Sequence, residues 1–321
     1  MILVHLETQG GKIDAQGFEL LAVARELATV SGRPVVAVVL GSLAPGEGAG
    51  LGVADRLILA NHPALDEFTP EAHARALAAI AIAIRPAVVL VAHSSRGMDV
   101  GPWLAARLGL PLAGPCTSVT AAPDGLEVTV GLYSGRIVMR AAVAWSAVLS
   151  LSPGAGDEAA GRLAGTPLTE TADIAAALDG LRSTVQSREV SQDDAVDLTR
   201  ADRILCVGRG IGSVDELPKF ADLAAAIGAE LAGSRPVVDA GWLPKSRQVG
   251  KSGARAAPKL YLAFGVSGAP EHLEGMSRAD MIVAINRDPS APIFEVAHVG
   301  VVADILTLVP ELTRLARNAA V

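Results

Sequence analysis

Apolar positions in the first part of the chain fall into short continuous runs, separated by longer stretches of helical periodicity. Runs rich in Val, Leu and Ile and bounded by turn residues are typical of parallel strands covered on both faces. The strands predicted in this way are Ile2–Leu6, Pro34–Leu40, Arg56–Ala60 and Ala87–Ala92. The predicted helices are Gln16–Thr29, Thr69–Ile84 and one near Gly101–Leu108, with loops at Gly41–Gly52 and Ser94–Gly97. This alternation predicts an α/β domain built on a parallel sheet.

The pattern changes after Pro111, where the apolar runs become shorter and turn residues become more frequent. Pro123–Gly125 and Ser134–Gly135 have the composition of hairpin turns. The strands around them are predicted at Thr117–Ala121, Leu126–Tyr133, Arg136–Ala144 and Ala147–Ser150. This part of the chain therefore predicts an antiparallel extension of the first sheet.

A second alternation of strands and helices begins near Arg203. Its predicted strands are Arg203–Val207, Glu230–Leu231, Leu260–Phe264, Met281–Ile285 and Val299–Val302. Its predicted helices are Val214–Ile227 and a terminal helix that Asp304 caps and that runs through Leu315. The stretch Gly154–Asp197 is rich in Gly, Ala, Ser and Asp, and its part Ser183–Asp194 is the best linker candidate. The sequence thus predicts two Rossmann-like α/β domains, residues 1–185 and 201–321, joined by a linker at 186–200. The second is predicted to be a doubly wound parallel sheet.

Three predicted loops follow strands of the second domain, at Gly208–Gly212, Gly265–His272 and Asn286–Pro289. Ligands of doubly wound sheets bind outside the carboxyl ends of the strands, so these loops predict a ligand site. The stretch Gly233–Gly275 adds small residues, which let a ligand approach the backbone closely. Its polar side chains are Ser234, Arg235, Gln248, Ser252, Ser267 and His272. Together these features suit a large, polar, anionic cofactor better than a packed core.

Two short motifs near this site are misleading. The run from Gly208 to Gly212 looks similar to a dinucleotide fingerprint, but its third glycine comes one position early for G-x-G-x-x-G. Gly250-Lys251-Ser252 looks similar to the end of a phosphate-binding P-loop, but the glycine required earlier in that motif is replaced by Lys245. Neither motif by itself indicates a nucleotide.

The charge, hydropathy and cysteine content of the chain argue against several classes of protein. The formal net charge is −7 and no basic cluster is present, which argues against nucleic acid as a partner. No apolar stretch approaches the roughly 18 residues that a membrane span needs, and the N-terminus lacks the basic region of a secretory signal. Cys116 and Cys206 lie far apart, without a C-x-x-C motif or a metal-spaced His/Cys cluster. We therefore expect a soluble cytoplasmic protein without a metal.

Residues Ala201 to Leu312 resemble the C-terminal FAD-binding domain of the electron transfer flavoprotein α subunit. The resemblance is carried, in colinear order, by G-R-G, G-S-R-P-V-V-D-A-G-W, Q-V-G-K-S-G, P-K-L-Y-L-A-F-G-V-S-G, H-L-E-G-M, I-V-A-I-N-R-D-P-S-A-P-I-F-E-V-A and D-I-L-T-L-V-P-E-L. The N-terminal half is similar to the same family more faintly, through Ser95–Asp99 and Leu104–Leu108.

The resemblance implies which residues contact FAD. Arg209 would lie on the diphosphate side, Ser234 and Arg235 near the isoalloxazine ring, and Asp304 near the adenosine. The full implied set is Arg209, Ser234, Arg235, Gln248, Val249, Gly250, Lys251, Ser252, Gly265, Ser267, Gly268, His272, Asn286, Asp304 and Ile305.

Two positions depart from the family's usual pattern, which has Thr in place of Ser252 and Gln in place of Lys251. Ser252 keeps a hydroxyl for flavin N5, whereas Lys251 adds a positive charge close to the ring or the phosphates. A flavin that accepts an electron gains negative charge at its N1–C2=O edge. A guanidinium over the ring and a donor at O2 would stabilise that charge in a water-poor site. We assign these two tasks to Arg235 and His272.

The resemblance also implies partners. The α subunit would hold FAD and form a heterodimer with an electron transfer flavoprotein β subunit, which holds AMP or, in bifurcating relatives, a second FAD. The pair would carry electrons from flavin dehydrogenases to a membrane quinone oxidoreductase without turning over a substrate of its own. The first domain would serve as the dimerisation platform, and Arg96 and Asp99 are candidates for contacts between subunits or domains.

Three alternatives remain open at this point. The chain could be a subunit of a bifurcating or specialised electron transfer flavoprotein. It could be a flavin- or NAD-dependent oxidoreductase acting alone, although the loops offer no acid–base group beyond His272. It could also be a nucleotide-binding regulatory module, which would form a stable monomer without flavin.

Overall fold

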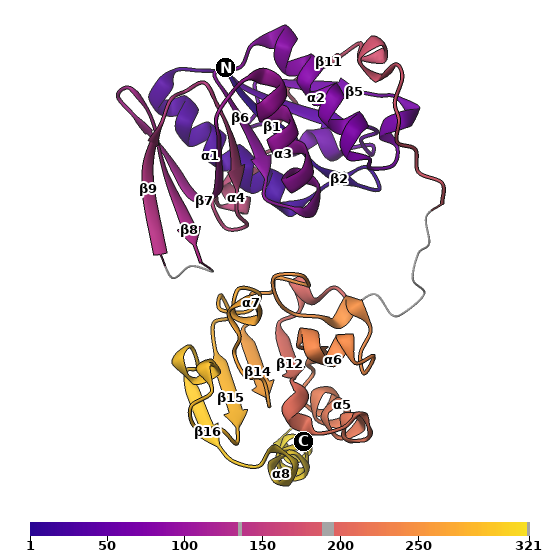
Figure 1. Ribbon diagram of the computed structural model, residues 1–321, viewed down its shortest axis with the longest axis vertical. Helices are drawn as coiled ribbons and strands as arrows, with labels where there is room; N and C mark the ends of the chain where they lie inside the picture. The colour runs from indigo at the N-terminus through magenta and orange to yellow at the C-terminus, as the bar shows by residue number, and fades with distance from the viewer. Residues whose placement is uncertain (134–136, 188–195, 320–321) are drawn as a thin grey trace. The chain divides into compact units, whose positions relative to one another are not determined.

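The computed structural model describes residues 1–133, 137–187 and 196–319. The chain divides into two compact units, residues 1–188 and 189–321, which are described separately below (Figure 1). The predicted linker at 186–200 falls mostly outside the described residues. Of its described part, Leu198 is buried in the core of the second unit.

The first unit contains one large mixed sheet, with the strand order β11-β5-β4-β1-β6-β10-β7-β8-β9 among the described residues. The strands from β11 to β7 pair in parallel, and β7, β8 and β9 pair antiparallel. Their bounds are β1 Ile2–Leu6, β4 Val35–Leu40, β5 Arg56–Ala60, β6 Val88–Ala92, β7 Leu112–Ala122, β8 Gly125–Leu132, β9 Ile137–Val143, β10 Ala147–Leu151 and β11 Leu168–Thr171. A small hairpin of β2 (Thr8–Gln9) and β3 (Lys12–Ile13) follows β1.

Helices cover both faces of this sheet (Figure 1). Helix α1 (Ala15–Ser31) packs on one face, and α2 (Pro70–Ile84) and α3 (Ser95–Leu108) pack on the other. Every residue of β1 and β4 is buried, because parallel strands between two helical layers have no solvent-facing side. The predicted α/β class is therefore confirmed, and the apolar runs of the sequence are the central strands.

The position of β10 differs from the predicted antiparallel extension. This strand returns to the sheet centre and pairs in parallel with both β6 and β7. All five of its residues are buried, as expected for a strand with neighbours on both edges and helices on both faces. Only β7, β8 and β9 form the predicted antiparallel meander, and its predicted turn at Ser134–Gly135 lies outside the described residues. The edge strand β11 was missed, because its residues are mostly exposed and form no apolar run.

Helix α3 begins six residues earlier than predicted, so the expected loop at Ser94–Gly97 was wrong. The Ser94 hydroxyl accepts a hydrogen bond from the Gly97 amide at 2.9 Å and caps the helix. Gly97 packs directly against the end of β6, where a Cβ atom would overlap the Ala92 carbonyl oxygen. Tertiary packing of these small residues outweighs the low helix propensity of glycine and of the internal Pro102.

The second unit is a five-stranded parallel sheet among the described residues, with the order β13-β12-β14-β15-β16. The strands are β12 Arg203–Val207, β13 Glu230–Gly233, β14 Leu260–Phe264, β15 Ile282–Asn286 and β16 Val299–Val302. The helices are α5 Leu217–Ala226, α6 Arg235–Asp239, α7 Pro270–Leu273 and α8 Ile305–Ala319, all visible in Figure 1. The predicted doubly wound sheet is confirmed, and its strand order reverses between β12 and β14.

Helix boundaries in this unit are close to those predicted. A 3₁₀ turn, Val214–Glu216, precedes α5, and the Asp304 carboxylate accepts the Leu306 amide at 2.9 Å at the start of α8. The short helices α6 and α7 were not predicted, because four- and five-residue elements carry too little periodicity to be recognised. Within the described part of the chain, no helix combines the length and apolarity needed to cross a membrane.

We expect Gly97→Ala to lower the free energy of unfolding of the first unit by about 2 kcal/mol or more, because the methyl group has to displace backbone atoms of β6. Gly48→Ala is the matched control, since a Cβ there meets no atom within 4 Å. Its effect should stay within about 0.5 kcal/mol. Urea unfolding followed by circular dichroism measures both, and equal stability of the two variants would contradict the packing described here.

Candidate functional site

A cavity of about 730 Å³ lies over the carboxyl end of the second sheet. Its walls come from the loops that follow β12, β13, β14 and β15, so it straddles the point where the strand order reverses. Cavities of this size are typical of small-molecule and cofactor sites. The topology of the sheet therefore creates the hollow, and the loops decide what it binds.

Most of the sequence-predicted contacts meet in this cavity. Those that line it are Arg209, Ser234, Arg235, Gln248, Val249, Gly250, Lys251, Ser252, Gly265, Ser267, His272 and Asn286. Gly268, Asp304 and Ile305 do not line it. Gly268 packs on the backbone of Ile293, Asp304 caps α8, and Ile305 is buried in the core. Their contact with a cofactor stays a prediction.

Close backbone packing fixes the loops after β12 and β14 against each other. The Gly210 amide donates to the Gly265 carbonyl at 3.1 Å. A Cβ atom on Gly208 would overlap that same carbonyl, and one on Gly210 would lie 2.7 Å from the Gly265 Cα. Gly265 has a positive φ of 62°. Glycine is required here because two backbones touch at the floor of the cavity.

A chain of side-chain hydrogen bonds orients Ser252. Lys245 Nζ donates to Gln248 Oε1 at 2.7 Å, and Gln248 Nε2 donates to Ser252 Oγ at 2.9 Å. Gln248 is buried, with only 1% of its surface exposed, so its amide orientation is set by these partners. Because the Ser252 oxygen accepts from Gln248, its own hydrogen is directed elsewhere, and Ser252 lines the cavity.

His272 lines the cavity, and its ring is almost completely buried. Its Nε2 lies 3.0 Å from the Tyr261 hydroxyl, and the backbone of Val249 is a second hydrogen-bond partner of the ring. Burial lowers the pKa of His272 to about 4, and the hydrogen bond to Val249 opposes this only in part. The ring is therefore neutral at pH 7. These buried partners fix the orientation of the ring in the cavity wall.

Charge around the cavity favours an anion. Four cationic side chains line it, against two acidic ones; they are Arg209, Arg235, Lys251 and Arg287 against Glu271 and Asp288. Arg235 is exposed, and its Nε lies 3.2 Å from the Asp239 carboxylate. Lys251, the departure noted in the sequence, lies 4.0 Å from Glu274, which also pairs with Arg255. Its charge is thus shared with an acidic neighbour.

Some lining residues were missed by sequence reasoning. Arg287 and Asp288 follow directly after the predicted Asn286, and Pro236 follows Arg235. The same loops place Val266, Ala269, Glu271, Ala291 and Pro292 in the wall. Their position directly after a strand could have indicated these residues. It predicted the loops, but it did not predict which side chains of a loop turn toward the cavity.

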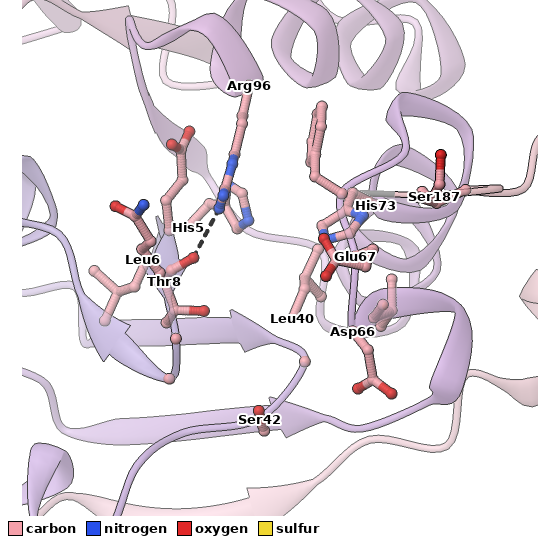
Figure 2. A pocket seen from close by; sticks show the side chains of 18 residues that line it. His5, Leu6, Thr8, Leu40, Ser42, Asp66, Glu67, His73, Arg96 and Ser187 are labelled. Carbon is pink, nitrogen blue, oxygen red and sulfur yellow. Dashed lines mark hydrogen bonds between the residues drawn. The ribbon is translucent and has the colours of Figure 1, made fainter. Parts of the chain in front are cut away.

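A second cavity, of about 500 Å³, opens at the carboxyl ends of β1 and β4 in the first unit (Figure 2). His5 and His73 lie in its wall, and Arg96 Nη1 donates to the Thr8 carbonyl at 2.7 Å, shown as a dashed line. Burial lowers the pKa of His5 to about 3 and that of His73 to about 4. Both rings are therefore neutral at pH 7.

Acidic groups dominate the charge of this second cavity. Its described lining holds Glu7, Asp66 and Glu67 against the guanidinium of Arg96. Burial raises the pKa of Glu7, whose carboxylate accepts from the Ser94 hydroxyl at 2.6 Å. The first cavity, with its cationic excess, is the better site for an anionic cofactor.

The fold and the first cavity define a class of protein, namely a nucleotide-cofactor binder whose site spans the reversal of a doubly wound sheet. Comparison with known proteins makes this specific. Residues 197–277 match a family model described as the electron transfer flavoprotein FAD-binding domain, and residues 2–177 match one described as the electron transfer flavoprotein domain.

Similar proteins include the electron transfer flavoprotein subunit alpha of Methylophilus methylotrophus, 34% identical over 97% of both chains. Protein FixB of Clostridium saccharobutylicum is 31% identical over 99% of this chain and 96% of its own. A subunit of Acetobacterium woodii named lactate dehydrogenase (NAD(+),ferredoxin) subunit LctC is 32% identical over 97% of this chain and 75% of its own. The chain belongs to the electron transfer flavoprotein α-subunit family.

The residues at the first cavity fit the FAD that this family's domain binds. The cationic excess suits a diphosphate, the glycine floor permits close approach, and the polar side chains of Gln248, Ser252 and His272 line the same cavity.

We expect the stability of the first unit to fall as the pH drops below about 6.5, because unfolded histidine binds a proton there whereas buried His5 does so only near pH 3. His5 alone then accounts for about 2 kcal/mol between pH 7 and pH 5. In His5→Gln this part of the pH slope disappears. Replacement of the exposed His298, in the second unit, leaves it unchanged. Urea unfolding of the first unit at several pH values measures the slope, and equal slopes in wild type and His5→Gln would refute the argument.

Proposed function

We propose that this chain is the FAD-holding subunit of an electron carrier that works with a β subunit. In this proposal it takes electrons from flavin dehydrogenases, including the acyl-CoA dehydrogenase type, and delivers them to a membrane quinone oxidoreductase. The observation that supports it most is the cavity over β12 and β14, with its glycine floor and its cationic excess. Alpha subunits of this family pair with a β subunit and act as electron carriers.

The backbone loops and cations would bind the diphosphate. Arg209 lies on the glycine loop after β12 and lines the cavity. Phosphates favour such a place because a nearby guanidinium compensates their negative charge. Arg287, after β15, is a second candidate for this task. These residues bind and hold the cofactor; they take no part in proton or electron transfer.

The polar groups at the other loops would orient the reactive ring. Bound FAD supplies the reversible uptake and release of electrons. The Ser252 hydroxyl, oriented by Gln248, is available as a donor, and His272 would lie beside the ring in the same wall. Arg235 carries its positive charge at the start of α6 and stabilises negative charge that the ring gains. In this role the chain tunes a cofactor and does not break bonds in a substrate.

An alternative is a bifurcating or specialised electron transfer flavoprotein. The observation that favours it is the 32% identity to the subunit named lactate dehydrogenase (NAD(+),ferredoxin). The two readings differ in what the β subunit holds, AMP for the simple carrier or a second FAD for the bifurcating one.

The test is to express the chain together with its β subunit, purify the pair and identify the nucleotides released on denaturation. One FAD and one AMP per heterodimer support the simple carrier, and two FAD support the alternative. Reduction by an acyl-CoA dehydrogenase with its substrate, followed by reoxidation through a quinone oxidoreductase, then tests donor and acceptor. A colourless, stable protein without flavin would contradict the proposal.

We expect Arg235→Ala to make reduction of the bound flavin less favourable by roughly 1 kcal/mol, since a charge beside the ring is lost at a partly exposed site. Lys259→Ala is the matched control. This variant also removes one positive charge. Lys259, however, directly precedes β14, at the amino end of the strand and so at the end away from the cavity, and its Nζ lies 3.0 Å from the Asp202 carboxylate. Spectroelectrochemical titration measures both potentials. Equal shifts of the flavin potential in the two variants would contradict the position of Arg235 beside the ring.

A further inference from the structure

A surface lysine, Lys245, contacts the candidate cofactor site from outside the cavity. It begins the 3₁₀ turn Lys245–Arg247, which directly precedes Gln248, and its side chain is exposed. Its Nζ lies 2.7 Å from Gln248 Oε1. Gln248 and Ser252 line the cavity, whereas Lys245 does not. Any effect of Lys245 on the hydrogen bonds of a ligand in the cavity is therefore transmitted by Gln248.

The direction of each hydrogen bond in this chain follows from the chemistry of Lys245. An ammonium group has three hydrogens to donate and no lone pair with which to accept. The amide atom that faces it must be the oxygen, and this places Gln248 Nε2 toward Ser252 Oγ, at 2.9 Å. An amide nitrogen donates and does not accept. The Ser252 oxygen is consequently the acceptor, and its own hydrogen points away from Gln248.

The position of Gln248 leaves only one alternative arrangement, in which its amide is turned over. The residue has 1% of its surface exposed. Its backbone amide donates to the Lys245 carbonyl at 3.1 Å, and its carbonyl accepts from the Ala254 amide at 2.7 Å. A Cβ atom on Gly253 would overlap the same carbonyl oxygen, so the backbone is closely packed as well. With the amide turned over, its NH₂ group would face the ammonium, and two donors would meet without an acceptor.

The lysine is the part of the chain that excludes the turned-over amide. If Lys245 loses its ammonium group, water replaces it, because this side chain lies at the surface. A water molecule can donate or accept, so it satisfies either orientation of the Gln248 amide. In the turned-over orientation Oε1 faces Ser252 and attracts the hydroxyl hydrogen. Ser252 would then present only lone pairs to the cavity.

We propose that Lys245 is a positioning residue that holds the Ser252 hydroxyl, through Gln248, as a hydrogen-bond donor toward an acceptor on the bound cofactor. The inference rests on the proposed function for the identity of that cofactor as FAD. In this arrangement a residue outside the cavity decides whether a hydroxyl in its wall donates or accepts. The orientation is set before the cofactor binds, which reduces the cost of ordering the site.

The first measurement records the side-chain amide of Gln248 by ¹H–¹⁵N NMR in the glutamine-labelled heterodimer after FAD is removed. A Gln248→Glu sample assigns the signal. In the wild type we expect one pair of N–H signals that exchange slowly with water, since the amide is buried in a single orientation. In Lys245→Met we expect two sets of signals or a broadened pair, because both orientations become populated. Lys245→Arg keeps an obligate donor and should preserve the wild-type signals.

The second measurement is a double-mutant cycle on the rebinding of FAD to the FAD-free heterodimer. We expect Lys245→Met to weaken binding about two- to tenfold, the usual range for one hydrogen bond. In a Ser252→Ala background the same substitution should have no further effect, because the hydroxyl that it acts on is absent. A positive charge that acted through space would instead weaken binding in both backgrounds.

Lys259→Met is the matched control for the cycle. It makes the same substitution at an exposed lysine at the amino end of β14, away from the cavity, and should leave FAD affinity unchanged. An equal loss of affinity in Lys259→Met and Lys245→Met would overturn the inference, since it would assign the effect to charge alone.

Three further results would contradict the role of Lys245. The first is a wild-type Gln248 amide with two populated orientations, and this measurement needs no variant to fold. The second is a single, slowly exchanging amide in Lys245→Met. The third is additive loss of FAD affinity in Lys245→Met combined with Ser252→Ala. A heterodimer that never binds FAD would refute the proposed function, whereas the amide signals, recorded without FAD, would still decide whether Lys245 orients Gln248.

Discussion

The contact on which the site depends is the backbone-to-backbone packing of two glycine loops, Gly208–Gly210 against Gly265. These loops follow β12 and β14, the two adjacent strands between which the strand order reverses. Chains leave these strands toward opposite sides, so a hollow opens above the sheet. Side chains at the glycine positions would force the loops apart and change the floor of the hollow. The cavity is therefore a consequence of topology, kept in shape by the absence of three Cβ atoms.

Two polar side chains in the wall of the cavity are each held in place by a buried group behind them. Gln248, itself bound by Lys245, orients Ser252, and Tyr261 engages His272. A polar group fixed in this way does not need to reorganise when charge develops nearby, which is the main way in which a protein stabilises such charge. Gln248 and Tyr261 are almost completely buried, so water does not compete for these hydrogen bonds.

The cavity of the first unit has a different chemical lining from that of the second unit. Its cavity also lies at the carboxyl ends of parallel strands, but acidic side chains and two neutral histidines line it (Figure 2). The same architecture thus produces two hollows of opposite charge preference within one chain. Fold alone does not assign a ligand; the side chains on the loops do.

The sequence by itself determined the central strands, such as β1, β4 and β6, because complete burial leaves an uninterrupted apolar run. It also predicted the loops of the candidate site, since the polar and glycine residues follow those strands directly. Tertiary structure alone decided that β10 returns to the sheet centre, since the length of an apolar run does not specify its neighbours. It also decided that α3 begins at Ser95, where packing outweighs helix propensity. The contact of Tyr261 with His272 depended on it too, because a strand residue and a helix residue meet only once the backbone between them has folded.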